Sequence, residues 1–323
     1  MRYNTLFKIL HIKLYHEHSA FHSCHLCFHS TRLHCQKIFK EELAERGMVI
    51  LSVYFLHPIF SFWGLSTKPM SLESLQVPFY YVLFSILTIG VGFIFARMFF
   101  EDVKERSIMT IAAAINNTGN LGIPLGIAIF GQESIIYTSM MSVANTLMTY
   151  TLGVFFYSAG TSSMKQAFLN IFKLPVIWAA MFALGLNFAG IVIHPTLFKS
   201  LEMGAYCMVV LQLIVFGMYL YNMKLGELNY KLLLHVHLIK FVIMPIITVW
   251  MLFFVLPLEP FVASVLFLEL IVPLAVTNVN ISALYDCKPV DVASLILFTS
   301  LLFIPFLLMV SYLLAYFGIA HLG

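Results

Sequence analysis

Long apolar segments recur through almost the whole of this chain and limit what it can fold into. A hydrocarbon core about 30 Å thick needs roughly 20 helical residues to cross it. Nine runs of suitable length lie near 48–66, 77–99, 108–131, 134–157, 171–193, 204–222, 231–255, 260–284 and 290–316. Hydrophobic residues form 61% of the chain and charged residues 10%, whereas soluble domains carry about 25% charge. The pattern predicts an all-α, multi-pass integral membrane protein with about nine spans.

The same composition excludes other classes of protein. The net charge of +3 offers no electrostatic support for a nucleic-acid partner. No His-Glu-x-x-His helix, Gly-x-Ser-x-Gly elbow or glycine-rich phosphate loop occurs in the sequence. Its three aspartates, Asp102, Asp286 and Asp291, fall in loops or at span ends. We therefore expect neither an enzyme nor a bound cofactor.

Lysine and arginine are divided unevenly between the two sets of connections. One set holds eleven, at Lys37, Lys40, Arg46, Arg97, Lys104, Arg106, Lys165, Lys173, Lys224, Lys231 and Lys288. The opposite set holds two, Lys68 and Lys199. Because basic loops stay in the cytoplasm, the bias places the first set inside. It predicts a cell membrane location, plasma or inner, with the C-terminus on the outer side.

Residues 1–46 do not share the apolar pattern. Seven of the twelve histidines and three of the five cysteines lie within 1–35. Cys24-x-x-Cys27 and the neighbouring histidines are potential zinc ligands, but they lack the two spaced ligand pairs of a zinc knuckle. We predict a divergent leader, disordered or non-native, that binds no metal.

Two spans contain helix-breaking residues near their middle. Residues 116–124 read Asn-Asn-Thr-Gly-Asn-Leu-Gly-Ile-Pro, and residues 272–280 read Val-Pro-Leu-Ala-Val-Thr-Asn-Val-Asn. Proline removes a helix hydrogen bond, and glycine weakens a helix interior. The two breaks are five spans apart, which indicates a five-helix repeat whose second copy is inverted in the membrane. Residues 161–323 would form a complete repeat, and residues 47–160 a repeat that lacks its first helix.

These segments also resemble a known family. Ala112 to Gly131, Glu269 to Ser300 with Pro273 and Tyr285-Asp286, and Val49 to Ser61 with Tyr54 and Pro58 resemble helices of the auxin efflux carrier family. The resemblance begins near residue 46, and the family's first helix has no counterpart. It implies two repeats, a scaffold and a core that move relative to each other, and two crossing broken helices. It also implies a secondary transporter of small organic anions, such as auxin-like or dicarboxylic acids.

The polar residues of the two breaks are the candidate substrate site. Broken helices present half-helix N-termini with free N–H groups and about half a positive charge, which suit a carboxylate. Side-chain amides and hydroxyls can add further hydrogen bonds. The predicted site comprises Asn116, Asn117, Thr118, Asn120, Pro124, Pro273, Thr277, Asn278 and Asn280. The alternative is that these residues only repair the broken helices.

Two charged residues within spans are candidates for ion coupling. Glu269 lies roughly 13 Å into its span, near the midplane, and an acid there is a candidate proton carrier. It would otherwise be a helix-end acid near the interface. Lys240 either takes part in coupling, pairs with Glu269, or extends to the headgroups. The coupling ion, a proton or sodium, is left open.

A second function is consistent with the same sequence motif. A solute-binding sensor or receptor on the same fold would carry the same motif without net transport. Asn145, Asn187 and Gln212 are single polar residues in spans, and helix–helix hydrogen bonding is their expected role. Partners are then the lipid bilayer and a small solute. The sequence leaves the oligomeric state open, a homodimer included.

Overall fold

The computed structural model describes residues 45–66, 76–256 and 258–316, and these residues are almost entirely helical. No strand occurs among them, apart from one isolated bridge between two chain segments. The leader up to residue 44, with its potential zinc ligands, lies outside this part of the chain. The all-α class predicted from the sequence is confirmed for the described residues.

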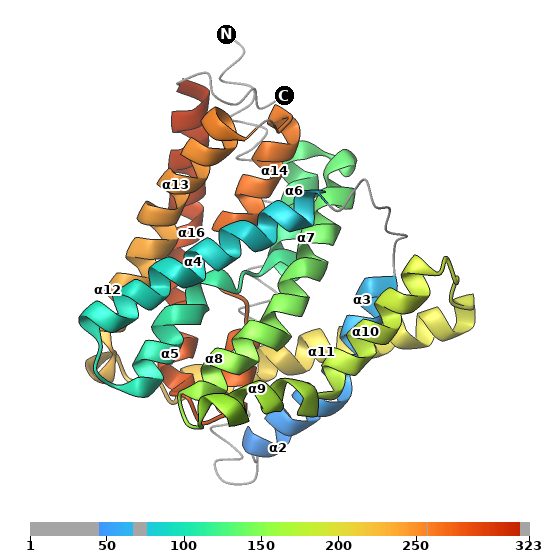
Figure 1. Ribbon diagram of the computed structural model, residues 1–323, viewed down its shortest axis with the longest axis horizontal. Coiled ribbons are helices and arrows are strands. Elements are labelled where there is room, and N and C mark those ends of the chain that lie inside the picture. The colour runs from blue at the N-terminus through green and yellow to red at the C-terminus, as the bar shows by residue number, and fades with distance from the viewer. Residues whose placement is uncertain (1–44, 67–75, 257, 317–323) are drawn as a thin grey trace.

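The first half of the chain forms the helices coloured from blue to green in Figure 1. Their elements are α2 (Glu45–Ile50), η1 (Leu51–Leu56), α3 (His57–Ser66), α4 (Gln76–Phe99), α5 (Val103–Ile111), η3 (Ala112–Ala114), η4 (Thr118–Gly122), α6 (Ile123–Phe130), η5 (Gln132–Ser134), α7 (Ile135–Met148), η6 (Thr149–Gly153) and α8 (Val154–Ala159). The predicted break in 108–131 is present between η3 and η4. Elements α2 to α3 and α7 to α8 run on without interruption.

The second half adds five segments. Its elements are α9 (Met164–Lys173), α10 (Pro175–Phe188), α11 (Pro195–Tyr221), η7 (Leu225–Glu227), α12 (Tyr230–Leu238), η8 (Ile239–Ile243), α13 (Met244–Trp250), η9 (Met251–Val255), α14 (Pro260–Ile271), α15 (Thr277–Leu284) and α16 (Pro289–Tyr316). The break predicted in 260–284 lies between α14 and α15. The helix predicted at 204–222 begins earlier, because Pro195 starts it and residues with polar side chains continue it.

By length and composition, five of the described helices can cross a membrane. A sixth counts if α9 and α10, which are bent by 56° at Leu174, form one span. Two shorter apolar helices cover Thr118–Phe130 and Pro260–Ile271, beside the two breaks. The prediction of nine spans counts each broken helix as a span, and it stays a prediction.

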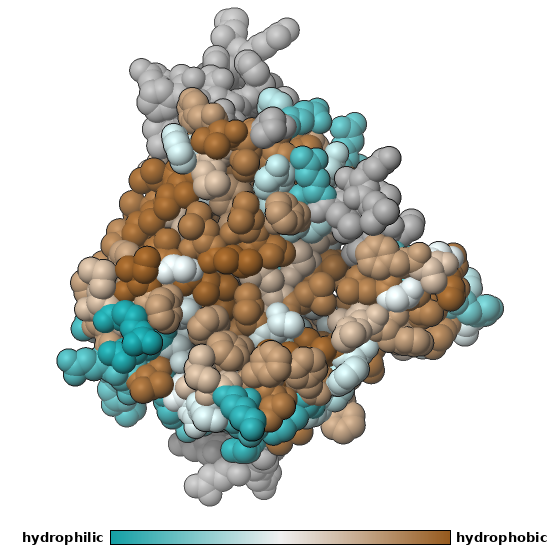
Figure 2. All heavy atoms as spheres, viewed as in Figure 1, coloured by the Kyte–Doolittle hydropathy of each residue, from teal (hydrophilic) through white to brown (hydrophobic). Residues whose placement is uncertain are grey.

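The outer surface is largely apolar. Figure 2 shows hydrophobic side chains over much of the visible face, with hydrophilic groups at the lower end, at the upper right and at the right edge. Large apolar side chains are exposed on several helices. The exposed fraction is 45% for Phe93 of α4, 55% for Trp178 of α10 and 65% for Ile246 of α13. Such a continuous apolar surface is unfavourable in water and suits contact with lipid.

The helices divide into two groups, visible in Figure 1. The side bundle consists of α2–α3, α10 and α11, and α3 packs closely on both α10 and α11. The main bundle contains α4, α5–α6, α7–α8, α12–η9, α14–α15 and α16. Both broken helices therefore belong to the main bundle.

An ionic cluster joins helix ends at one side of the main bundle. Lys288 lies 3.4 Å from Asp102 and 2.7 Å from Glu105, and Lys104 lies 3.1 Å from Asp286. Asp102 also caps α5, because its carboxylate accepts a hydrogen bond from the Glu105 N–H. That bond, followed by Lys288, holds the pKa of Asp102 below its usual value. The cluster ties the start of α5 to the start of α16.

Candidate functional site

The two breaks meet inside the main bundle and complete each other's backbone hydrogen bonds. The Asn117 N–H donates to the Pro273 carbonyl at 2.8 Å, and the Ala275 N–H donates to the Ile115 carbonyl at 3.0 Å. Between them, Asn116 and Leu274 form a short antiparallel bridge. Unpaired backbone groups are unfavourable in a membrane. Each break therefore supplies hydrogen-bond partners for backbone groups that the other break leaves unpaired. We call this point the crossing.

Asn116 links the crossing to three neighbouring helices. Its side-chain amide donates to the Tyr81 hydroxyl at 3.2 Å, and its side-chain oxygen accepts from Lys240. Asn145 donates to the Asn116 carbonyl at 2.7 Å and accepts from the Tyr81 hydroxyl at 3.0 Å. Asn116 is only 2% exposed. Its hydrogen-bonding groups are thus used to hold the break in place.

Asn278 and Asn280 are fully buried in α15. Asn278 donates to the carbonyls of Ile115 and Ala275, at 3.2 and 2.9 Å, and accepts from the Tyr157 hydroxyl at 2.8 Å. Asn280 donates to the Ser52 hydroxyl, 3.0 Å away in the side bundle. Both of these predicted site residues therefore act as structural anchors in this conformation, and neither lines a cavity described below.

A small polar cavity of about 50 Å³ lies directly against the crossing. Its wall consists of His57, Phe60, Asn116, Asn117, Thr118, Gly119, Asn120, Ser142, Asn145, Thr146, Thr149, Tyr150, Gln212, Ala275 and Thr277. Most of these residues carry amide or hydroxyl groups. We call it the crossing cavity.

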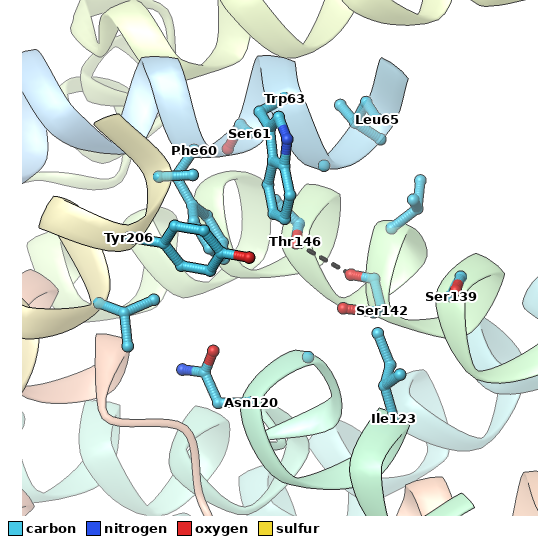
Figure 3. A pocket seen from close by; sticks show the side chains of 15 residues that line it. Phe60, Ser61, Trp63, Leu65, Asn120, Ile123, Ser139, Ser142, Thr146 and Tyr206 are labelled. Carbon is cyan, nitrogen blue, oxygen red and sulfur yellow. Dashed lines mark hydrogen bonds between the residues drawn. The ribbon is translucent and has the colours of Figure 1, made fainter. Parts of the chain in front are cut away.

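A larger cavity of about 320 Å³ adjoins it, between the side bundle and the main bundle. Figure 3 shows Phe60 and Trp63 of α3 and Tyr206 of α11 on one side, with Ser142 and Thr146 of α7 opposite. Phe60, Gly119, Asn120, Ser142 and Thr146 line both cavities. We call the larger space the vestibule, because it continues from the crossing cavity between the two bundles.

Three predicted site residues offer unused polar groups to the crossing cavity. The side chains of Asn117 and Asn120 are half-buried and make no hydrogen bond to any described residue. The Thr118 hydroxyl is buried and likewise has no partner in the described part of the chain. These groups are available to a bound solute.

The remaining predicted site residues are placed differently. Thr277 starts α15 at the cavity wall, and its hydroxyl accepts a hydrogen bond from Gln212 of α11. Pro273 is buried and contributes its carbonyl to the crossing. Pro124 is exposed in the first turn of α6 and lines neither cavity.

Glu269 is fully buried in α14, and neither of its carboxyl oxygens has a hydrogen-bond partner among the described residues. Its carboxyl lies directly on the backbone of Gly122, where an added Cβ atom would overlap it. Glu269 lies in the last turn of α14, and its role in ion coupling stays a prediction. The carboxyl touches the interrupted helix itself.

Lys240 is also buried, at 2% exposure. Its ammonium donates to the Asn116 side chain and, at 2.9 Å, to the Leu270 carbonyl. The described residues contain no ion pair between Lys240 and Glu269, so that pairing, considered from the sequence, is wrong for this conformation. Extension of Lys240 to the headgroups is also wrong, since its ammonium points to the crossing.

The sequence matches a protein-family model over most of its length. The family model described as Membrane transport protein, that of the auxin efflux carriers, matches residues 32–311. The chain belongs to the auxin efflux carrier family. The match begins earlier than the resemblance seen near residue 46 and so includes part of the predicted leader. No curated protein matches the sequence.

In this auxin efflux carrier family member, several wall residues were not predicted from the sequence. They are His57, Phe60, Ser142, Thr146, Thr149, Tyr150 and Ala275. Gln212 and Asn145 also line the cavity, and the helix–helix hydrogen bonds expected for them and for Asn187 are confirmed. A histidine inside an apolar span was the one available signal for His57.

Wide π-helical turns occur at several of these positions. His57 directly follows η1, Tyr150 lies in η6, Lys240 lies in η8, and Thr118 opens η4. Such turns are rare and are enriched at functional sites. The family member thus combines two broken helices with locally widened ones around one cavity.

Proposed function

We propose that this protein is a secondary transporter that moves a small organic anion across the cell membrane by alternating access. The observation that carries the proposal is the crossing cavity, a polar space at the meeting point of two interrupted helices. Family membership supports a transporter, and the free groups of Asn117, Thr118 and Asn120 support a binding site at this point. The cell membrane and an outward C-terminus are part of the proposal.

The preference for an anion rests on charge. The helical segment that begins at Thr118 and the helix that begins at Thr277 both start at the cavity wall. The helix dipoles place partial positive charge at both starts. At α15, the Asn278 and Val279 N–H groups already donate to the Ala275 and Val276 carbonyls. Lys240 lies one hydrogen bond behind Asn116 and adds a further hydrogen-bond donor at the crossing. No carboxylate residue lines the crossing cavity, so negative charge is supplied by the solute.

Alternating access rests on the uneven contact between the two bundles. Asn280 with Ser52, and Thr277 with Gln212, join α15 to the side bundle. On the other side of the crossing cavity, the vestibule separates α3 and α11 from α6 and α7. Breaking the two contacts while closing the vestibule would expose the cavity to the opposite side. Residues 47–160 and 161–323 would be inverted repeats in this mechanism. Their symmetry would then relate the state open to one side of the membrane to the state open to the other.

Glu269 is the proposed coupling group, and a proton is the proposed ion. An ionised carboxylate without donors is costly inside a membrane, whereas a protonated one is not. Since Glu269 contacts Gly122 of η4, a change in its charge would act directly on the segment that carries Thr118 and Asn120. Lys240 would hold the crossing through its hydrogen bonds to the Asn116 side chain and the Leu270 carbonyl.

The proposal is tested by uptake into proteoliposomes. Indole-3-acetate and malonate would be offered separately, with and without an imposed pH gradient, to the wild type and to Asn120→Ala. We expect saturable uptake of one acid, reduced about tenfold or more in the variant, since a hydrogen bond to a charged group contributes about 1.5–3 kcal/mol.

Asn222→Ala is the matched control, because Asn222 bonds Glu45 at a helix end far along the chain from either break. It should transport like the wild type. Binding of an acid without any flux would contradict the transporter and favour a receptor on the same fold. Equal flux in wild type and Asn120→Ala would remove the crossing cavity from the mechanism.

A further inference from the structure

We infer that His57 is the residue that binds the carboxylate of the solute, and that it takes up a proton when the anion binds. This inference rests on the proposed function and specifies the chemistry of its site. It assigns to the side bundle a direct role in recognition, in addition to the broken helices of the main bundle.

The first observation is the composition of the cavity walls. Among the residues that line the crossing cavity and the vestibule, His57 is the one whose side chain can become positively charged near neutral pH. The others are amides, hydroxyls, aromatic rings and apolar groups. An anion that enters this space can therefore pair with a protonated wall side chain only at His57.

The second observation is the orientation of the imidazole ring. Nδ1 of His57 lies 3.1 Å from the Ser52 carbonyl oxygen, which can only accept a hydrogen bond. Nδ1 therefore carries a hydrogen, and Nε2 is the ring nitrogen left for a ligand. Residue 57 follows the π turn η1, so its backbone N–H bonds the same Ser52 carbonyl. One carbonyl thus fixes both the backbone and the ring of His57.

The third observation is an unused hydroxyl beside the ring. Tyr150 packs edge-on against His57, with ring centroids 5.2 Å apart. Its hydroxyl is buried and has no hydrogen-bond partner in the described part of the protein. Both residues line the crossing cavity. A carboxylate between them would accept from Nε2–H of a protonated His57 and from the Tyr150 hydroxyl, which satisfies both groups.

The surroundings of His57 explain why protonation should accompany anion binding. Tyr150 of η6 packs on the ring, Gln212 of α11 and Thr277 of α15 share the cavity wall with it, and Met208 and Asn280 contact its partner Ser52. None of these is charged, and α10, which also packs on α3, contains no ionisable residue. A buried imidazolium without a counter-charge is unfavourable. The empty site therefore holds neutral His57, and a carboxylate makes the charged form favourable.

More distant charges point in the same direction. Lys240 lies behind Asn116 and supplies no negative counter-charge to His57. Glu269 lies against Gly122, which lines neither cavity, so it is not the partner of His57. Glu45 and Arg46 belong to the same continuous helix as His57, about three turns away. One proton from water then converts imidazole to imidazolium for each carboxylate bound.

The test is isothermal titration calorimetry of the detergent-solubilised full chain with indole-3-acetate and with malonate. Repeating the titration at pH 7.5 in buffers of different ionisation enthalpy gives the number of protons taken up. We expect about one proton per anion in the wild type, and affinity that falls up to tenfold per pH unit above neutrality. His57→Gln, which cannot be protonated, should bind at least about tenfold more weakly, with no proton uptake.

Two further variants keep the test decisive if His57→Gln does not fold. Glu269→Gln should still take up one proton per anion, and loss of uptake there would assign the proton to Glu269 and overturn the inference. Tyr150→Phe should weaken binding about three- to tenfold and keep the proton uptake. His194→Gln, at the exposed start of α11, is the control and should match the wild type.

The outcomes separate this inference from the proposed function. Wild-type transport and binding with an unchanged proton count in a folded His57→Gln variant would overturn the role of His57 and leave the transporter intact. Failure of the wild type to bind or transport either acid would overturn the proposed function, and the inference with it.

Discussion

The two breaks that meet at the crossing differ in what their polar residues do. In the first break, Asn117, Thr118 and Asn120 leave amide and hydroxyl groups free toward the crossing cavity. In the second break, Thr277 and Asn278 are hydrogen-bonded to other helices. A broken helix thus needs polar residues for two purposes. The first break has free groups beside one anchoring residue, Asn116, whereas Thr277 and Asn278 of the second break are both anchored.

The largest effect is expected when an anchoring residue is removed. Asn278→Ala would leave the Tyr157 hydroxyl without its present partner and remove one of two hydrogen bonds to the Ile115 carbonyl, which keeps the Ala275 N–H. Because a buried unpaired polar group costs about 1–3 kcal/mol and a lost hydrogen bond about 0.5–1.5 kcal/mol, we expect a loss of about 2–4 kcal/mol in the free energy of unfolding. Thermal unfolding in detergent measures it. An unchanged unfolding temperature would show that the second break does not anchor the crossing.

A free residue of the first break should behave in the opposite way. Asn117→Ala removes an amide that bonds no described residue, so the unfolding temperature should stay within experimental error. Initial rates of solute uptake should fall about 10- to 100-fold, because the lost hydrogen bond is to a charged ligand. Uptake and thermal unfolding are compared on the same preparation. A large loss of stability would place Asn117 with the anchors.

Glu269 tests whether charge at α14 acts on the first break. Glu269→Gln keeps the size of the side chain against Gly122 and cannot ionise. We expect the pH dependence of uptake to flatten, and a pH gradient to stimulate uptake less, by about threefold or more, than in the wild type. Uptake rates between pH 5.5 and 8.5 measure this. A profile identical to that of the wild type would exclude Glu269 as the coupling group.

The smallest effect is expected at the ionic cluster, away from both breaks. Lys288→Gln should lower the free energy of unfolding by less than about 1 kcal/mol, since these ion pairs are partly exposed. The lowered pKa of Asp102 means that its contribution is present at neutral pH and is lost as the pH falls through that lowered value. The pKa of Lys288 is raised, despite desolvation, by Glu105 and Asp102, so its contribution is lost only as the pH rises through that raised value.

The difference between wild type and Lys288→Gln should therefore be constant around neutral pH and shrink as the pH falls through the lowered pKa of Asp102. Unfolding temperatures measured from neutral to acidic pH test it. A difference that grows on acidification would contradict the assignment of the cluster to Asp102. Solute uptake should be unaffected, which separates the cluster from the binding residues.

The positions of both breaks could be predicted from the sequence, because proline, glycine and asparagine interrupt otherwise continuous apolar runs. The division between free and anchoring residues could not. Asn116 and Asn117 are adjacent, and only the positions of Tyr81, Asn145 and Lys240 on other helices decide that Asn116 is engaged. Contacts between residues far apart in the chain are not contained in a local pattern.

The ends of the helices show the same limit of prediction from a local sequence pattern. The 24 residues of α4 follow an uninterrupted apolar run and were predicted closely. The start of α11 was placed too late, because its first turns, with Lys199 and Glu202, are polar although helical. His57 was missed because a lone histidine in an apolar span is more often a packing residue. Its position beside the crossing comes from the packing of α3 on α11.

The π turn before His57 has a consequence for how such a site could change. A π turn contains one residue more than an α turn, and each residue of a helix corresponds to about 100° of rotation. Deleting a single residue within Leu51–Leu56 would turn the face of α3 by that angle relative to α2. A different side chain would then meet the solute, although every residue of α3 stayed the same. Chain length, rather than side-chain replacement, is therefore a direct route to altered solute selectivity in this carrier.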